Sequence, residues 1–389
     1  MFIPDLLWLL LPVAAMAGWF AAKRNDARRP DAFWDYTKHF HQDLNVLLSE
    51  QPDKTPELFE ALSGTSRDTA ETHIALGNHY RRRGDMERAV LLHQSVIDKV
   101  ELHADIRDTA RVELARDYRS AGLLDRSEQV LHELLESEHR RDDAYESLLQ
   151  LHEQEADWQQ AITVAIEFDR STERKLGPRI AHYYCELAAQ SEKLGERDEA
   201  TERLLQAVRH HPGCARALMM QASLALASGD YDRSLELYDQ VESLRSELMP
   251  EIIDSRFQAF KAAGDQERLL SFVKRIREQR NAYSVIRSTR QIIAELHSDA
   301  LADRFFKEQI LRRPSLKGLR DWAHDQVELS KPGERDKVRV ICNLLDQVIE
   351  DKPVYRCNSC GFQGNVMHWR CPGCGRWDSV STIIGVEGE

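Results

Sequence analysis

The stretch LGNHYRRRGDMERAV, residues 76–90, contains the pattern that decides the fold. It supplies a small residue beside a leucine, an aromatic residue, a turn glycine and a later alanine: Leu76-Gly77, Tyr80, Gly84 and Ala89. This order is typical of a helix-turn-helix repeat of about 34 residues. His93 stands where the pattern expects an apolar residue. The run of three arginines before Gly84 is expected to close the first helix, where cations are favourable.

Similar units follow along the chain. Turn glycines stand at Gly84, Gly122, Gly195, Gly229 and Gly264, at separations of 38, 73, 34 and 35 residues. One unit without a turn glycine must lie inside the longest gap, and we place its turn at Ala156. The last unit also lacks a turn glycine but keeps Ala302, Phe306 and Pro314. A degenerate first unit is expected between Asp31 and Leu62, where apolar residues have helical spacing.

The repeated residues specify packing. Small residues let the two helices of a unit approach closely, and large ones fill the gap to the next unit. We therefore predict an all-α fold, a superhelix of tetratricopeptide-type repeats over residues 35–350. A final amphipathic helix should end before Pro353, with its apolar residues at Val338, Ile341, Leu344, Leu345, Val348 and Ile349.

The N-terminus predicts a membrane anchor. Residues 6–22 form a run of 17 residues without a charge, just long enough to cross a bilayer as a helix. Asp5 is the charged residue before the run, and basic residues follow it at once, which places the rest of the chain in the cytoplasm. A cleaved signal sequence and a buried core helix are the alternatives. We expect an anchor at 1–23 and a juxtamembrane linker at 24–34.

Composition limits the kinds of partner. The 389 residues carry 53 basic and 65 acidic side chains, a net charge of −12, which repels a phosphate backbone. We expect no binding to nucleic acid. The seven cysteines are an odd number and include two tight pairs, a spacing that favours a reducing, intracellular setting over a disulfide framework.

Four of the cysteines predict a metal site, in a module over residues 351–389. Two Cys-x-x-Cys-Gly knuckles, CNSCG and CPGCG, are separated by ten residues and supply Cys357, Cys360, Cys371 and Cys374. Four sulfurs in tetrahedral order suit Zn²⁺ or a single iron ion and leave no coordination position for a water molecule. A structural role is therefore favoured over catalysis. An iron electron carrier and a nucleic-acid-binding zinc ribbon remain alternatives.

Only Pro353 to Arg356 separate this module from the last predicted helix. A connection of this length does not act as a flexible linker. We expect the module to dock against the final helices, with Trp369 and Trp377 in a small core or in that interface.

Other candidate motifs are incomplete. His132-Glu133 and His152-Glu153 lack the second histidine of a zinc hydrolase, so they are expected to be ordinary helix residues. The phosphate-binding, dinucleotide-binding and hydrolase-elbow motifs do not occur. Cys185, Cys214 and Cys342 fall among apolar residues and are expected to fill the core. We therefore expect a protein that is not an enzyme.

In this order, anchor, repeats and knuckles resemble the lipopolysaccharide assembly protein B family of Gram-negative bacteria. The resemblance covers essentially the whole length, and its marks are LLPVAA at 10–15, LGNHYRRRG at 76–84, IAHYYCELA at 180–188, YRCNSCGF at 355–362 and WRCPGCGRW at 369–377. The second knuckle is similar to that of rubredoxin, which favours iron as the metal, whereas zinc is the physical default for a structural site.

The resemblance also implies a function. Members of this family are inner-membrane proteins that face the cytoplasm and restrain lipopolysaccharide synthesis. They are thought to act as adaptors between the membrane protease FtsH and the deacetylase LpxC, and a PbgA-type membrane protein counteracts them. A generic scaffold for envelope enzymes and a rubredoxin-type redox protein are the alternatives. The sequence does not decide whether the array forms a homodimer.

Overall fold

The computed structural model describes residues 67–386 apart from 138, 173–174, 280 and 351. The expected anchor at 6–22, the linker and the degenerate first unit lie outside this part. Within the described residues, no helix is both long and apolar enough to cross a membrane. The chain divides into two compact units, residues 1–114 and 115–389.

The first unit contains a helical hairpin that matches the predicted repeat. Helix α4 spans Arg67–Arg83, α5 spans Met86–Ile97, and α6, Ala104–Ser120, begins in this unit. Gly84 has a φ of 86°, and Asp85 accepts a hydrogen bond from the Arg88 N–H as the N-cap of α5. His93 is fully buried, and a Cβ on Gly77 would lie 2.5 Å from its ring. The histidine thus fills the apolar position because the glycine opposite leaves room for it.

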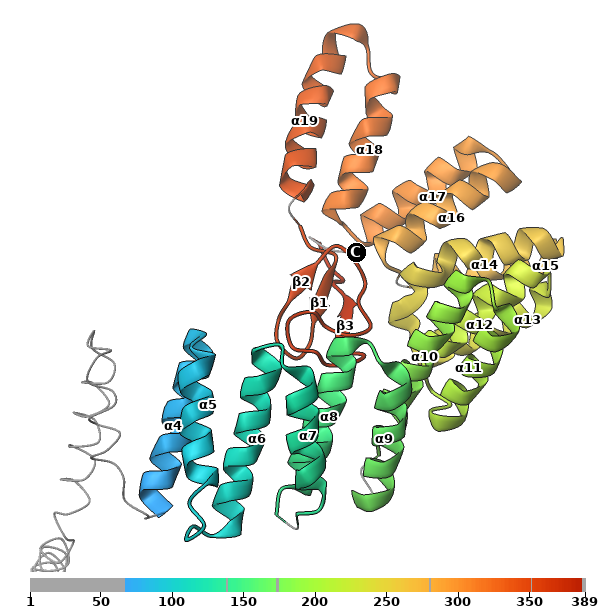
Figure 1. Ribbon diagram of the computed structural model, residues 1–389. Coiled ribbons are helices and arrows are strands. Elements are labelled where there is room, and N and C mark those ends of the chain that lie inside the picture. The colour runs from blue at the N-terminus through green and yellow to red at the C-terminus, as the bar shows by residue number, and fades with distance from the viewer. Residues whose placement is uncertain (1–66, 138, 173–174, 280, 351, 387–389) are drawn as a thin grey trace, which may run out of the picture. The chain divides into compact units, whose positions relative to one another are not determined.

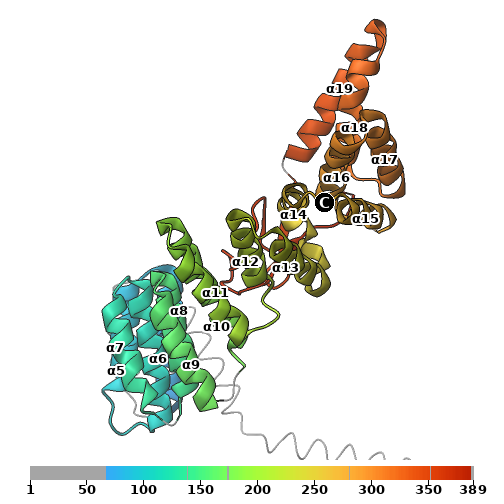
Figure 2. The same ribbon diagram turned by 90° about the vertical axis from the view of Figure 1, so that its right-hand side faces the viewer.

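The second unit continues the array as helical hairpins (Figures 1 and 2). After α6 its helices are α7 Leu124–Leu135, α8 Arg141–Glu155, α9 Trp158–Thr172, α10 Gly177–Leu194, α11 Arg197–His210, α12 Ala215–Ser228, α13 Tyr231–Leu244, the 3-10 helix η2 Ser246–Leu248, α14 Met249–Ala263, α15 Gln266–Glu278, α16 Tyr283–Leu296, α17 Asp299–Arg312, α18 Leu316–Leu329 and α19 Pro332–Glu350. The predicted last helix is α19, which packs on α18. The repeat pattern of the sequence did not predict α18.

The predicted turns are confirmed. All five turn glycines have a positive φ, between 69° and 86°, a conformation that L side chains rarely adopt. Ala156 ends α8 in the same left-handed region, with a φ of 56°. Ala156 therefore adopts the left-handed turn conformation that glycine adopts in the neighbouring repeats.

Side-chain hydrogen bonds connect the first helices of neighbouring repeats. Arg119 on α6 donates to Gln150 on α8 at 2.7 Å, and Arg179 on α10 donates to Glu146 on α8 at 2.9 Å. These helices therefore present charged and polar side chains along one face, while alanines such as Ala161 are fully buried between the helices of each pair.

The C-terminal module is small and mostly irregular. Strand β1, Tyr355–Cys357, pairs antiparallel with β2, Gln363–Gly364, and with β3, Val380–Thr382, in the order β2-β1-β3. Cys357 lies opposite Val380 in this sheet. The fold is thus mostly helical, with one three-stranded sheet in the metal module.

Candidate metal centre and its docking surface

Two equivalent turns present the cysteines. In the first, the Gly361 N–H donates to the Cys357 carbonyl at 3.0 Å, and in the second the Gly375 N–H donates to the Cys371 carbonyl at 2.9 Å. Both glycines have a left-handed φ, 78° and 71°, where a side chain would be strained. The glycine after each pair therefore closes the turn that points both sulfurs of the pair to one side.

The four sulfurs meet at one point. All of them lie within 4.8 Å of one another. The Sγ atoms of Cys357 and Cys374 are 3.8 Å apart, and those of Cys360 and Cys371 are 3.6 Å apart. A tetrahedral zinc or iron site with metal–sulfur bonds of about 2.3 Å requires sulfur separations of about 3.8 Å. The arrangement therefore fits one ion bound by four thiolates.

The surroundings of Cys357 favour the thiolate form of its side chain. Cys357 Sγ lies 3.4 Å from the Ser379 hydroxyl and accepts a hydrogen bond from the Ser359 N–H. The hydrogen bond with Ser379, together with those from backbone amides, lowers the pKa of the Cys357 thiol to about 6. Cys357 and Cys371 are buried, whereas Cys360 and Cys374 reach the surface. With four protein ligands, no position is left open for a reacting water.

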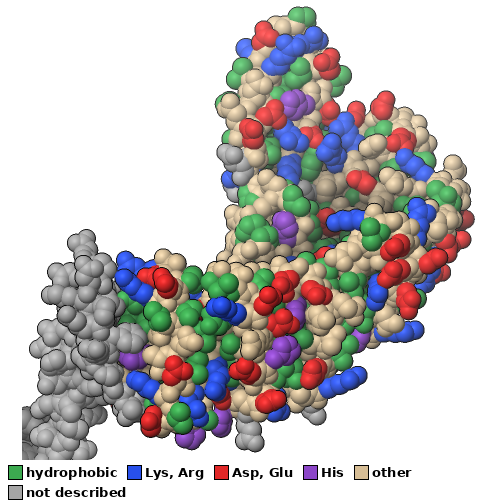
Figure 3. Space-filling model, in the orientation of Figure 1, with side chains coloured by type: hydrophobic (Ala, Val, Ile, Leu, Met, Phe, Trp, Pro, Cys, Tyr) green, Lys and Arg blue, Asp and Glu red, His purple; other side chains and the backbone are tan. Residues whose placement is uncertain are grey.

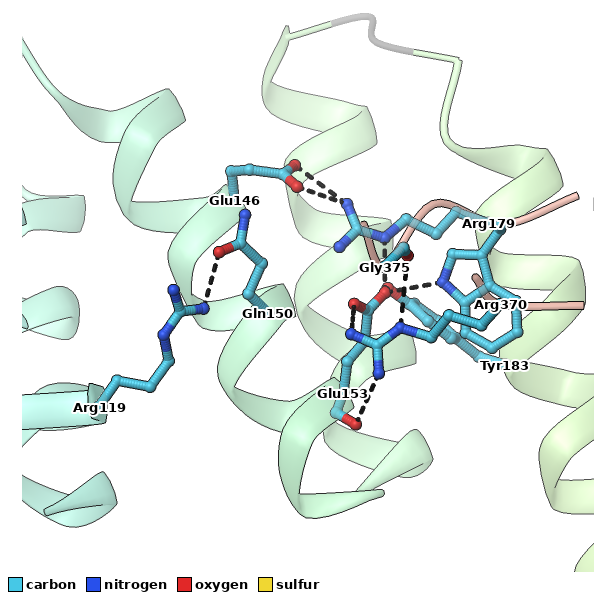
Figure 4. A network of polar contacts seen from close by, with 9 residues as sticks. Arg119, Glu146, Gln150, Glu153, Arg179, Tyr183, Arg370 and Gly375 are labelled. Atoms are coloured by element: carbon cyan, nitrogen blue, oxygen red, sulfur yellow. Dashed lines mark hydrogen bonds and ion pairs between the residues drawn. The ribbon is translucent and has the colours of Figure 1, made fainter. Parts of the chain in front are cut away.

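The module is held to the array by a buried carboxylate, that of Glu153 on α8 (Figure 4). Its side chain is only 2% exposed. Arg370 of the module donates to Oε2 at 2.8 Å, and the Trp377 indole N–H donates to Oε1 at 2.9 Å. From the array, Arg179 and Tyr183 of α10 donate to Oε1 at 2.9 and 2.6 Å.

These donors keep Glu153 ionised. Burial raises its pKa, but the charge of Arg179 and the hydrogen bonds from Tyr183 and Trp377 lower it by more. The pKa of Glu153 therefore lies below the ordinary value for a glutamate. An anion with two arginines and two neutral donors is a satisfied buried charge rather than an orphaned one.

Aromatic packing surrounds this carboxylate. The Trp377 ring stacks on His182 with centroids 5.0 Å apart and meets Trp158 and Tyr183 edge to face at 6.0 and 5.8 Å. Burial lowers the pKa of His182 to about 4, so this ring is neutral at pH 7. Trp377 therefore contributes an apolar ring and one hydrogen-bond donor to the same contact.

Further contacts extend the interface along the array. Arg245, which follows α13, donates to both carboxylate oxygens of Asp378 at 2.8 Å. The Tyr355 hydroxyl donates to Glu251 on α14 at 2.6 Å. The Arg216 guanidinium of α12 lies 5.9 Å from the centre of the Trp369 ring. Helices from four repeats, α8 to α14, thus hold the module.

Our expectation that the module docks against the final helices was wrong. Its ion pairs, hydrogen bonds and ring contacts go to α8, α9, α10, α12 and α14. Helix α19 instead packs Cys342 against α18. The tail does reach α18, where the Leu316 N–H donates to the Val386 carbonyl. The short connection after α19 fixes where the module begins in the sequence. The buried Glu153 carboxylate and the aromatic side chains around it determine where the module binds on the array.

The interpretation of Glu153 as an ordinary helix residue was also wrong. It has no hydrolase role, but it is the carboxylate on which the module docks. A signal was present in the sequence, because Glu153 lies four residues after Leu149 and eight after Tyr145, both buried, on the same side of the helix. A carboxylate on an apolar face requires buried donors. Cys185, Cys214 and Cys342 are buried, as expected.

Fold and site together define a tetratricopeptide-repeat protein with a four-cysteine, rubredoxin-like module. Residues 355–381 match the family model of a rubredoxin metal binding domain, and residues 72–103 and 192–246 match tetratricopeptide repeat models.

Similarity to curated proteins extends over the whole chain. Lipopolysaccharide assembly protein B of Escherichia coli strain K12 is 30% identical over 388 residues, which cover 99% of each chain. The protein of the same name from Haemophilus influenzae is 24% identical over 396 residues, 98% of this chain and 99% of its own. The chain belongs to the lipopolysaccharide assembly protein B family.

Proposed function

We propose that this protein acts in lipopolysaccharide assembly as a non-enzymatic adaptor anchored in the inner membrane by residues 6–22, with the repeats in the cytoplasm. In this role it brings the deacetylase LpxC to the protease FtsH, and a PbgA-type membrane protein opposes it. The observation that carries the proposal is the match to lipopolysaccharide assembly protein B over 99% of both chains.

The geometry supports a structural role for the metal. Four sulfurs complete the coordination shell, and the module they fold is bound to helices from four repeats. An ion in this place maintains a binding surface and does not need to take part in a reaction. Tethering at a membrane raises the effective concentration of an adaptor near a membrane protease without any new contact.

The half-life of LpxC tests this proposal. In Escherichia coli depleted of its own relative, expression of the full chain should shorten the half-life of LpxC after translation is stopped. A chain without residues 1–22 should not shorten it, and neither should the full chain in cells with inactive FtsH. An unchanged half-life with the full chain would refute the adaptor role.

Rubredoxin-type electron transfer is the second candidate, because Cys360 and Cys374 reach the surface. It requires a reversible one-electron couple in the purified iron form. It also requires that function be lost when zinc replaces iron. A zinc form that still shortens the half-life of LpxC would leave only the structural role.

A further inference from the structure

Two cysteines meet in the core of the array, outside the metal module. On the face seen in Figure 3, acidic, basic and apolar side chains are interspersed over the helical hairpins. Beneath the surface, Cys185 on α10 and Cys214, the residue before α12, belong to one buried cluster, and their thiols lie within hydrogen-bonding reach. Cys185 is fully buried and Cys214 is 3% exposed. Two adjacent thiols can form a disulfide, whereas the cluster around Cys342 contains no second cysteine.

Small neighbours let the two helices approach each other at this point. Ala181 and Ala188 lie one helical turn before and after Cys185. Ala217 lies one turn after Cys214. All three alanines are fully buried in the same cluster as the cysteines. A disulfide requires Cα atoms about 5.5 to 6 Å apart, and side chains of a single methyl group permit such a close approach.

Cys214 has the surroundings of a reactive thiol. It is the N-cap residue of α12, where the positive end of the helix dipole favours a thiolate. The hydrogen bond with Cys185 lowers the pKa of the Cys214 thiol against the effect of burial, and the charge of Arg216 lowers it further. The same hydrogen bond and burial raise the pKa of Cys185. Within the pair, Cys214 is therefore the nucleophile and Cys185 the second thiol.

Contacts to the metal module lie beside the two thiols. Glu186, next to Cys185, accepts a hydrogen bond from Arg216 at 2.8 Å, so an ion pair already joins the same two segments. The Arg216 guanidinium and the His182 ring lie 5.9 and 6.0 Å from the centre of the Trp369 ring. A covalent link between α10 and the start of α12 would therefore fix the part of the docking surface that receives this tryptophan.

We propose that Cys185 and Cys214 form a modification site, a dithiol that hydrogen peroxide oxidises to a disulfide between α10 and the start of α12. Peroxide reaches Cys214 when the first turn of α12 opens locally. In a reducing compartment such a disulfide is transient, because other thiols reduce it again. The inference goes beyond the adaptor role and does not depend on it.

The oxidation takes place in two steps. The Cys214 thiolate attacks one peroxide oxygen, the O–O bond breaks, and Cys214 becomes a sulfenic acid while the hydroxide that leaves takes up a proton. Cys185 then loses its proton and attacks the Cys214 sulfur, so that the S–S bond forms, the S–O bond breaks and a second water leaves. The two thiols give up two electrons, which reduce one peroxide to two waters.

Mass spectrometry after treatment with hydrogen peroxide tests the proposal on the purified full chain with its metal bound. The remaining thiols are alkylated in denaturant, and trypsin releases peptides 180–193 and 210–216, each with one of the two cysteines. These peptides should appear linked, at their summed mass less two hydrogen atoms, and dithiothreitol should separate them. Cys342 should be oxidised roughly tenfold less, because it has no second thiol in its cluster.

Two variants separate the roles of the thiols. Cys214→Ser keeps a favoured N-cap residue for α12, and Cys185 should then stay a free thiol after peroxide treatment. Cys185→Ala removes the second thiol and should trap the sulfenic acid at Cys214, where dimedone captures it. Parent chain in which Cys185 and Cys214 are alkylated as fully as Cys342 would overturn the proposal. A linkage of either cysteine to the metal centre in place of the other would overturn it as well.

Discussion

At the scale of single residues, one carboxylate determines where the metal module rests. Glu153 accepts hydrogen bonds from Arg179 and Tyr183 of α10 and from Arg370 and Trp377 of the module. Two positive charges therefore face one buried anion, although Arg179 also pairs with Glu146. Removing the buried anion leaves Arg370 without its ion pair, and this costs more than the pair itself contributes.

We expect Glu153→Gln to weaken the docking of the module. The amide keeps the shape of the side chain but removes the charge that Arg179 and Arg370 face, so the free energy of local opening in α8 and α10 should fall by about 3 kcal/mol. Hydrogen exchange of the backbone amides measures this quantity. Glu155→Gln, two residues away and exposed, should change it by less than about 0.5 kcal/mol.

The effect of Glu153→Gln should depend on pH. The folded-state pKa of Glu153 lies below the value of 4.5 for an unperturbed glutamate. The charge therefore stabilises the folded state fully above pH 4.5, and this contribution is lost as the pH falls through the lowered pKa. The difference between the parent chain and the variant should be constant from pH 7 to 5 and shrink below that. A difference that grew on acidification would contradict the assignment.

At the scale of elements, the turns between helices and the two cysteine knuckles were predicted correctly from the sequence. Gly84, Gly195 and Gly264 end their helices as predicted, and Gly361 and Gly375 close the two knuckles. These features are local, since a left-handed residue or a Cys-x-x-Cys spacing is visible within a few positions. Docking was not predictable in this way, because Arg370 lies 217 residues from Glu153 and no repeat pattern links them.

Ala156 occupies a turn position at which other repeats have glycine. We expect Ala156→Gly to stabilise the array. Glycine adopts a φ of 56° without the steric cost that alanine has there. A gain of up to about 1 kcal/mol would raise the melting temperature by roughly 2 °C. Ala189→Gly, inside helix α10, should lower it by a similar amount. If both variants lowered the melting temperature, the turn would not be strained.

Cys371→Ser should free the module without disturbing the last hairpin. With one thiolate missing, the purified chain should lose most of its metal, and trypsin should cut faster after Arg370 and Arg376. Sites in α18 and α19 should be cut at the parent rate, because these helices pack on each other. Cys342→Ser, on α19, should speed cleavage in the α18–α19 hairpin but leave the metal bound. Faster cleavage in α18 after Cys371→Ser would support docking on the final helices.

At the scale of the whole molecule, segments that are far apart in the sequence of the second unit come into contact. The array from α8 to α14 supplies the docking surface, and a module more than one hundred residues further on folds around four cysteines and rests on it. Metal binding and docking must therefore be linked. Whatever stabilises the docked module also raises the affinity for the ion that folds the module.

Metal affinity of Arg370→Gln, Glu153→Gln and the double variant, measured by competition with a chelator, tests this linkage most directly. Both changes remove the same contact at the array. Each single variant should bind the metal about tenfold to one hundredfold more weakly than the parent chain, and the double variant should be no weaker than the weaker single variant. Unchanged affinity in all three, with the four cysteines intact, would show that the module binds its ion without resting on Glu153 and would contradict the account.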